Sequence, residues 1–132
     1  MLTVVSQDPD LVVKELYFGA STQGSNAFDA NLDRVAPPNP SPPILLDAYF
    51  PLDDAHINRL YTNIHQANES QIYLLRVQAD QDGFSLNWHS GFLPTEYSSA
   101  FLQTPGQRID MRQQNQADFA AGNYEFEIVL EI

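Results

Sequence analysis

The chain has 132 residues, 43 % of them hydrophobic, which is the size and composition of one globular domain, so we expect residues 1–132 to share a single core. The 17 acidic residues outnumber the 6 basic ones and give a formal net charge of -11, which disfavours nucleic acid and anionic membrane surfaces as partners because such binding depends on Lys and Arg. There is no cysteine, which excludes disulfides, thiolate nucleophiles and Cys-ligated zinc.

The N-terminal segment is apolar but short. Met1 is followed by LTVVSQDPD, which lacks the basic region and apolar stretch of a signal peptide, so we expect an intracellular protein or a processed or excised piece of a longer one. No apolar run approaches the roughly 18 to 20 residues of a membrane span, so membrane insertion is not expected. Residues 1–10 are interpreted as an extension of the domain or a donor strand.

Short strands separated by Gly- or Pro-bearing turns follow along the chain. Asp82-Gly83 supplies turn chemistry, so 72–78 and 84–89 are predicted to form a hairpin in which Trp88 shares a core face with Phe84 and Leu86. The other predicted strands are 11–18, 44–50, 98–102, 107–112 and 124–132.

The alternation is clearest at the C-terminus. Tyr124, Phe126, Ile128, Leu130 and Ile132 face one way, and glutamates face the other. This pattern predicts a half-buried antiparallel strand whose outward glutamates discourage aggregation through its edge.

The segment DDAHINRLYTNIHQ departs from the alternation. Ile57, Leu60, Tyr61 and Ile64 recur at helical spacing behind Asp53 or Asp54 as an N-cap, which predicts a short helix. Many strands with at most one short helix favour an all-β fold, a two-layer antiparallel β-sandwich of Ig-like or jelly-roll-like type, with a small barrel as the alternative.

Five prolines lie between Pro37 and Pro43 and predict an extended path without ladder pairing. The segment is interpreted as a stiff crossover between sheets or a strap along an edge. An SH3-type ligand is the less favoured alternative, because no Arg or Lys flanks the prolines as such a groove requires.

The order of several short motifs resembles a β-rich module found in large secreted or cell-surface proteins. An FG turn, a D-x-x-L-D loop, an APP segment, a D-A-x-F strand, an L-x-W strand, an L-P pair and an I-D-M-R strand follow one another over about residues 11–132. The matching residues are Phe18, Gly19, Asp29, Leu32, Asp33, Ala36, Pro37, Pro38, Asp47, Ala48, Phe50, Leu86, Trp88, Leu93, Pro94, Ile109, Asp110, Met111 and Arg112. The resemblance implies a non-catalytic extracellular module near sorting, adhesion or carbohydrate-active domains, with no active site.

Catalysis is not predicted. His56 and His65 are nine residues apart, which does not present both imidazoles on one helix face, so both are interpreted as surface histidines. His89 and Ser90 are adjacent and are expected to point to opposite faces of a strand. No nucleophile elbow, phosphate-binding loop or dinucleotide fingerprint occurs in the sequence.

Calcium is the favoured metal hypothesis, with Asp29 and Asp33 as candidate ligands in a predicted loop. Further acidic pairs lie at residues 8–10, 53–54 and 80–82, and none of the pairs completes an EF-hand. The interpretation favoured over calcium binding is that Asp29 and Asp33 cap local amides of a turn.

A glycan site would need an exposed aromatic ring with polar neighbours. Trp88, Tyr61 and Tyr73 are candidates, although the alternation favours a core position for Trp88. Tyr97 in GFLPTEYSS is predicted to be the exposed, ligand-binding one. Asn68-Glu69-Ser70 fits a glycosylation sequon, which matters only if the chain is exported by a glycosylating cell.

The leading functional hypothesis is a non-catalytic structural or interaction module of the cell exterior. The strand at 124–132 and the N-terminal LTVV are expected to add to the sheets of neighbouring domains or identical subunits, and head-to-tail addition would give a filament. The alternative is a calcium- or carbohydrate-binding accessory module of a secreted protein. A metal-assisted hydrolase using the three histidines is a distant third.

Overall fold

A computed structural model describes residues 1–7, 13–38, 45–54 and 56–132. The described residues are all β, as predicted, apart from one 3-10 turn, η1 (Ser90–Phe92). The strands are β1 (Leu2–Ser6), β2 (Val13–Ser21), β3 (Arg34–Val35), β4 (Asp47–Pro51), β5 (Arg59–Gln66), β6 (Gln71–Ala79), β7 (Phe84–Trp88), β8 (Ser99–Thr104), β9 (Gln107–Asp110), β10 (Gln116–Phe119) and β11 (Gly122–Glu131).

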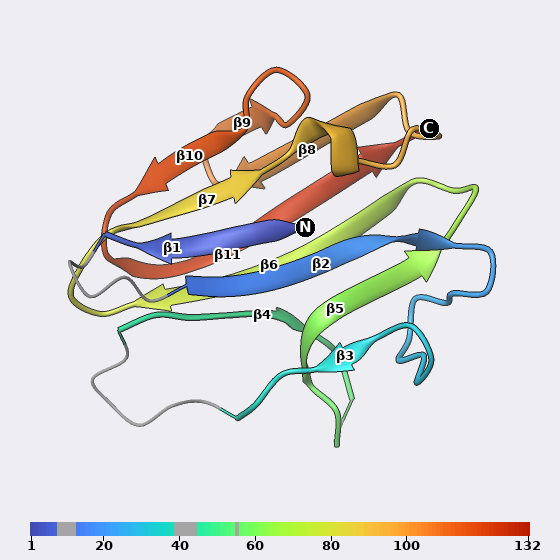
Figure 1. Cartoon of the computed structure of the whole chain (residues 1–132), viewed down its shortest axis with the longest axis horizontal. Coiled ribbons are helices and arrows are strands. Elements are labelled where there is room, and N and C mark those ends of the chain that lie inside the picture. Colours follow the sequence, from blue (N-terminus) through green and yellow to red (C-terminus); the bar gives the residue numbers. More distant parts are fainter. Residues whose placement is uncertain (8–12, 39–44, 55) are drawn as a thin grey trace.

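These eleven strands belong to one mixed sheet, shown in Figure 1. Ten of them follow the order β10-β7-β1-β2-β5-β4-β6-β11-β8-β9, and β3 pairs with β5 beside this path. The pair β2 and β5 runs parallel, whereas β1 with β2 and β6 with β11 are examples of the antiparallel pairs. The sheet curls into a half-barrel, so strands from its two halves contribute to one buried core.

The predicted two-layer sandwich is therefore confirmed only in its all-β character. β5 joins the two halves of the sheet, because Thr62 to Gln66 pair with β2 while Leu60 pairs with Phe50 of β4. β4 in turn pairs with β6. The ladder is continuous from β10 to β9 within the described residues, and a single curled sheet results.

Alternation along β6 and β11 places the core on the inner face of the curl. Tyr73 and Leu75 of β6 and Phe126, Ile128 and Leu130 of β11 are fully buried. The predicted outward orientation of the C-terminal glutamates is confirmed, since the pattern of β11 alternates over its central residues. Burying each such side chain contributes about 1.5–3 kcal/mol to stability, so this pair of strands supplies a large part of the core.

The predicted hairpin between residues 72–78 and 84–89 is wrong. β6 pairs with β4 and β11, whereas β7 pairs with β1 and β10. Gly83 is instead a point of close approach: its carbonyl accepts a hydrogen bond from Gln7 N (2.9 Å), and a Cβ there would lie 2.6 Å from Phe119 O. The turn chemistry is local, but long-range pairing decides which strands become neighbours.

The predicted helix between residues 53 and 66 is also wrong, because β5 occupies most of this segment. Asp54 does cap amides, with its Oδ1 accepting from His56 N (2.8 Å) and Ile57 N (2.9 Å), but the chain then extends into a strand. Ladder pairing with β2 and β4 overrides the helical spacing of the apolar residues.

The remaining predicted strands are confirmed at the described residues. β7, β8, β9 and β11 overlap the predicted segments, although β9 ends at Asp110 and so leaves residues 111–112 in a turn. β2 covers the described part of 11–18, and β4 begins only at Asp47 within the predicted 44–50. Residues 11, 12 and 44 lie outside the described residues. So do the acidic pair at positions 8–10 and the proline segment beyond Pro38.

Neither segment proposed as a strand donor lies at an edge of the sheet. β1 has β2 on one side and β7 on the other, and Figure 1 shows it between these two strands with the N-terminus near the middle of the view. β11 lies between β6 and β8. The ends of the strand path are β10 and β9, which have only four residues each.

Candidate binding site

The loop between β2 and β3 holds the two predicted calcium ligands, and both carboxylates accept amide hydrogen bonds. Asp29 Oδ2 accepts from Ser25 N (2.8 Å), and Asp33 Oδ2 accepts from Asp29 N (2.9 Å). Among the described residues, no group of three or more His, Asp or Glu side chains is arranged to hold a metal ion. The contacts fit the turn-cap alternative, and calcium binding stays a prediction.

The same loop covers the outer edge of β5. Thr62 pairs with Tyr17 of β2 on one side and with Arg34 of β3 on the other. Further along this outer edge, Ile64 N donates to Asp33 Oδ1 (2.7 Å) and Gln66 N donates to Asn26 Oδ1 (3.4 Å). Side chains thus satisfy amides that would otherwise remain open to pairing with another chain.

A hollow of about 270 Å³ lies between this loop, the segment after β4 and the outer face of β6. Phe28 and Leu52 form apolar walls together with Ile72 and Leu74 of β6. Asp53 and Asp54 also line it and are exposed at its rim. Ile72 is 54 % exposed and Leu74 37 %, which is unusual for large aliphatic residues at the centre of a sheet face.

Asn63 is the buried polar residue of this hollow. It lines the hollow, and only 4 % of its surface is exposed. Its amide makes no hydrogen bond to a described residue but is not fully enclosed, because the Tyr97 hydroxyl is the one fully buried, unpaired side-chain group among the described residues. An amide that opens onto a hollow can exchange its water for hydrogen bonds to a ligand. An unpaired amide lining a hollow is therefore positioned to bind something outside the chain.

His65, next to Asn63 on the lining, is a buried neutral ring rather than the predicted surface histidine. Its ring stacks on Tyr73 with 4.1 Å between centroids, and its Nδ1 lies 2.9 Å from Gln71 Oε1. Gln71 Nε2 donates to Gln66 O and Glu69 Oε1, so Gln71 Oε1 is the acceptor and His65 Nδ1 carries the proton. Burial lowers the pKa of His65, and the Gln71 hydrogen bond opposes this only in part.

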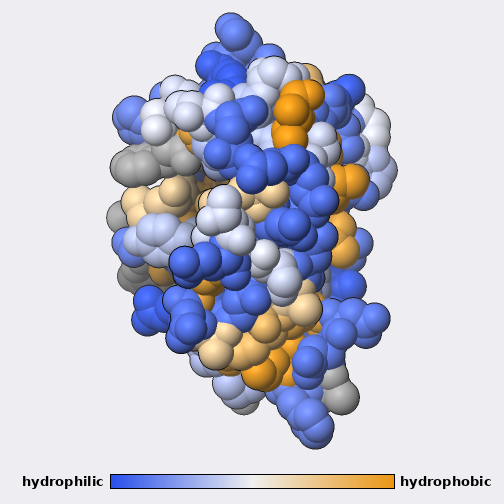
Figure 2. Space-filling view, turned by 90° about the vertical axis from the view of Figure 1, so that its right-hand side faces the viewer, coloured by the Kyte–Doolittle hydropathy of each residue, from blue (hydrophilic) through white to orange (hydrophobic). Residues whose placement is uncertain are grey.

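A second hollow of about 450 Å³ is lined by the same residues 51–53. It shares Leu52 and Leu74 with the first and adds Tyr49, Arg59 and Arg76. We call the two hollows together the outer trough. Figure 2 shows the end of the molecule where β5 meets β6, with apolar surface broadening toward the bottom and hydrophilic side chains around it.

Arg59 fixes one wall of the second hollow. Its Nη2 donates to Asp47 Oδ1 at 2.7 Å, both side chains being largely buried, and its guanidinium lies 3.8 Å from the centroid of the Tyr49 ring. Its Nε also donates to Pro37 O (2.8 Å). A buried charge held by three partners gives the wall a defined shape.

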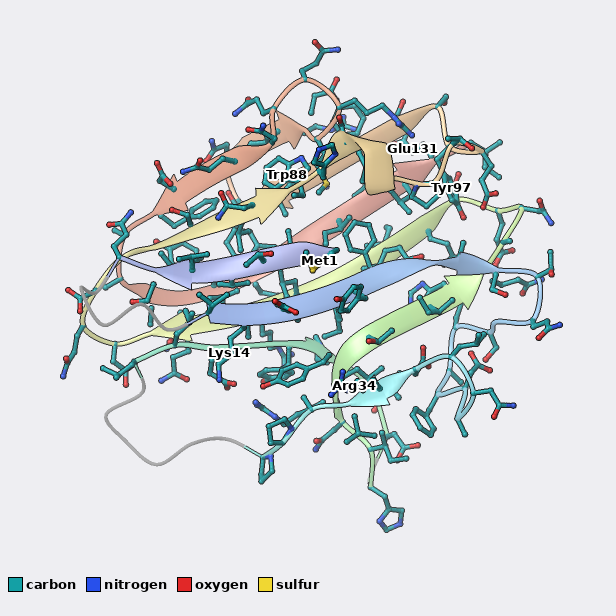
Figure 3. The ribbon with its side chains drawn as sticks, viewed as in Figure 1. Met1, Lys14, Arg34, Trp88, Tyr97 and Glu131 are labelled. Carbon is teal, nitrogen blue, oxygen red and sulfur yellow. The ribbon has the colours of Figure 1, made fainter. Side chains whose placement is uncertain are left out.

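Tyr97, the predicted ligand-binding ring, is buried at 1 % exposure, so its predicted exposure is wrong, while ligand binding by Tyr97 stays a prediction. Arg112 Nη2 donates to Tyr97 O (2.7 Å) and Pro94 O (3.0 Å), which holds the preceding loop against the sheet and the ring inside. Figure 3 shows Tyr97 near Glu131, far along the sheet from Arg34. Trp88 is buried as predicted, with Nε1 donating to Met111 O (2.8 Å).

The three histidines lie in separate environments. His56 is exposed after β4, His65 stacks on Tyr73, and His89 accepts from Gly91 N (3.3 Å) through Nδ1 at the start of η1. The exposed Asn68 of the sequon has a φ of 67° in the turn between β5 and β6. Tyr73, another glycan candidate, is fully buried, and Tyr61 is half-buried.

No sequence pattern predicted Phe28, Asn63 or Leu74 as residues of a binding site. A polar residue between Tyr61 and His65 has no pattern of its own once the segment is interpreted as a helix. The signal that points to Leu74 is the continuous apolar run Ile72 to Leu75 within an alternating strand, which leaves apolar side chains on both faces.

No family model matches the chain, and no curated protein and no solved structure matches it either. The resemblance to modules of secreted or cell-surface proteins therefore stays a prediction. No helix among the described residues is both long and apolar enough to cross a membrane.

Proposed function

We propose that the protein is a non-catalytic binding module of the cell exterior that recognises its partner through the outer trough. The main support for this proposal is Asn63, a largely buried polar residue whose amide opens onto the trough beside exposed aliphatic side chains. Polar groups placed within an apolar concave surface are the usual design of a binding site. The extracellular location derives from the resemblance in the sequence.

The proposed interaction surface is the outer trough and not an edge of the sheet. β1 and β11 are paired on both sides, and the outer edge of β5 is capped by Asp33 and Asn26. The separate environments of the three histidines support the non-catalytic part of the proposal.

The test is an NMR titration of the labelled protein with neutral oligosaccharides, acidic oligosaccharides, hexalysine and calcium chloride. We expect saturable shifts confined to the trough, lost in Leu74→Glu and kept in Val13→Glu, which changes an exposed apolar residue of β2 in the same way. Light scattering of the same samples reports self-assembly. Concentration-dependent polymers without any shift in the trough would overturn the proposal in favour of an edge-assembled subunit.

A further inference from the structure

We infer that the hollow over Asn63 binds one ring of a neutral saccharide. This inference rests on the proposed function of the outer trough. It names the class of ligand for one of the two hollows of the trough, the one that Asn63 lines. It is carried by the polar groups, the apolar walls and the charge of the hollow, which select the same chemistry independently.

The polar groups match hydroxyls. Asn63 offers a donor and an acceptor from one planar amide, and adjacent sugar hydroxyls can satisfy both. Asn26 uses its Oδ1 to accept from Gln66 N, which directs its amide nitrogen away from that bond. With Nδ1 of His65 donating to Gln71, the other ring nitrogen is an acceptor in the neutral ring.

The apolar walls match the C–H face of a sugar ring. Phe28 is half-buried on one side of the hollow, and Leu52 and Leu74 contribute aliphatic surface on the other. A volume of about 270 Å³ lies just below the ~300–1,000 Å³ typical of drug-sized sites, which suits one ring rather than a larger ligand.

Charge excludes acidic sugars and disfavours a buried cation. None of the described Lys and Arg residues lines this hollow, and Asp53 and Asp54 lie at its rim in a chain of net charge -11. A cation reaching Asn63 would meet a neutral amide and a neutral imidazole, which do not compensate for the loss of its hydration. Asp54 already accepts two amide hydrogen bonds and is exposed, so solvent screens its attraction.

The experiment uses the full chain on an array of neutral and acidic glycans, followed by NMR titration with the strongest neutral oligosaccharide, with hexagalacturonate and with hexalysine. Asn63→Leu keeps the shape of the side chain and removes its polar atoms. We expect roughly tenfold or greater loss of saccharide affinity, the loss of one or two hydrogen bonds. Asn87→Leu, the same change in β7, should leave the affinity unchanged.

The melting temperature of the Asn63→Leu variant distinguishes a binding role of Asn63 from a structural one. Because the Asn63 amide opens onto the hollow and makes no hydrogen bond to a described residue, Asn63→Leu should melt at the same temperature as the parent or higher. Weaker saccharide binding with unchanged or raised stability supports the inference. Saccharide binding that Asn63→Leu does not weaken overturns it.

Two further outcomes distinguish the inference from the proposed function. Shifts in the trough with hexalysine or hexagalacturonate but with no neutral saccharide would overturn the inference and support the trough as a binding surface. The absence of shifts in the trough with every probe would overturn both.

Discussion

Two buried tyrosines of the core differ in one atom's environment. The Tyr73 hydroxyl donates to Gly19 O, whereas the Tyr97 hydroxyl has no hydrogen-bond partner among the described residues. Burial raises the pKa of both phenols, so each stays a neutral donor at physiological pH. Only Tyr73 gains from its hydroxyl, because an unpaired buried hydroxyl costs its lost hydration.

We therefore predict opposite effects from the same substitution. Tyr97→Phe should leave the free energy of unfolding unchanged or raise it by up to about 2 kcal/mol, and Tyr73→Phe should lower it by about 1 kcal/mol. Urea denaturation of both variants measures the difference. Equal destabilisation would show that the Tyr97 hydroxyl is satisfied in solution.

His65 predicts how stability depends on pH. Its pKa is lowered in the folded protein, so the unfolded chain binds the proton more tightly. The stability of the folded state is therefore highest above the unfolded pKa of about 6.5 and falls as the pH drops from there through the folded pKa.

The matching measurement is urea denaturation between pH 8 and pH 5. This range contains the pKa of about 6.5 that His has in the unfolded chain. His65→Gln should flatten the part of the fall that begins below about pH 6.5, whereas His56→Gln, a change in an exposed loop, should keep it. An unchanged profile in His65→Gln would assign the dependence to other groups.

At the scale of the element, side chains of the β2–β3 loop complete β5. Asp33 accepts from Ile64 N and from Asp29 N, so one carboxylate joins the loop to the outer edge of the strand. Charge-assisted hydrogen bonds of this kind are worth about 1.5–3 kcal/mol each. The aspartate that the sequence marks as a metal candidate thus has a structural role in the fold.

Replacing Asp33 should expose this edge. We predict that Asp33→Ala lowers the free energy of unfolding by about 2–4 kcal/mol and increases aggregation, because two amides lose their acceptor. Asp53→Ala, at an exposed position, should have little effect. Thermal melts with light scattering measure both quantities, and equal behaviour of the two variants would contradict this role of Asp33.

At the scale of the whole molecule, the curl makes the N-terminal strand part of the domain rather than an appendage. Leu2 and Val4 are fully buried, and β1 separates β2 from β7. Without β1 the path of the sheet is broken between these strands, and two rows of backbone groups lose their partners.

Deleting residues 1–6 should therefore abolish cooperative unfolding, which near-UV circular dichroism and calorimetry detect. The donor-strand hypothesis for residues 1–10 makes a different prediction, in which the shortened domain stays folded and only assembly is lost. A sharp melting transition of the shortened chain would contradict the role of β1 described by the structure.

The sequence by itself determined the all-β class, most of the strands, the burial of Trp88 and the alternation of β11. These features depend on period-two patterns and turn residues, which act over a few residues. Tertiary structure alone decided that residues 72–78 and 84–89 are not neighbours, that residues 59–66 form a strand, and that Tyr97 is buried. It also placed Asn63 in a hollow with Phe28 and Leu74, because these residues meet only where the sheet curls and the β2–β3 loop returns to β5. Such contacts join residues far apart in the chain, and no local pattern specifies them.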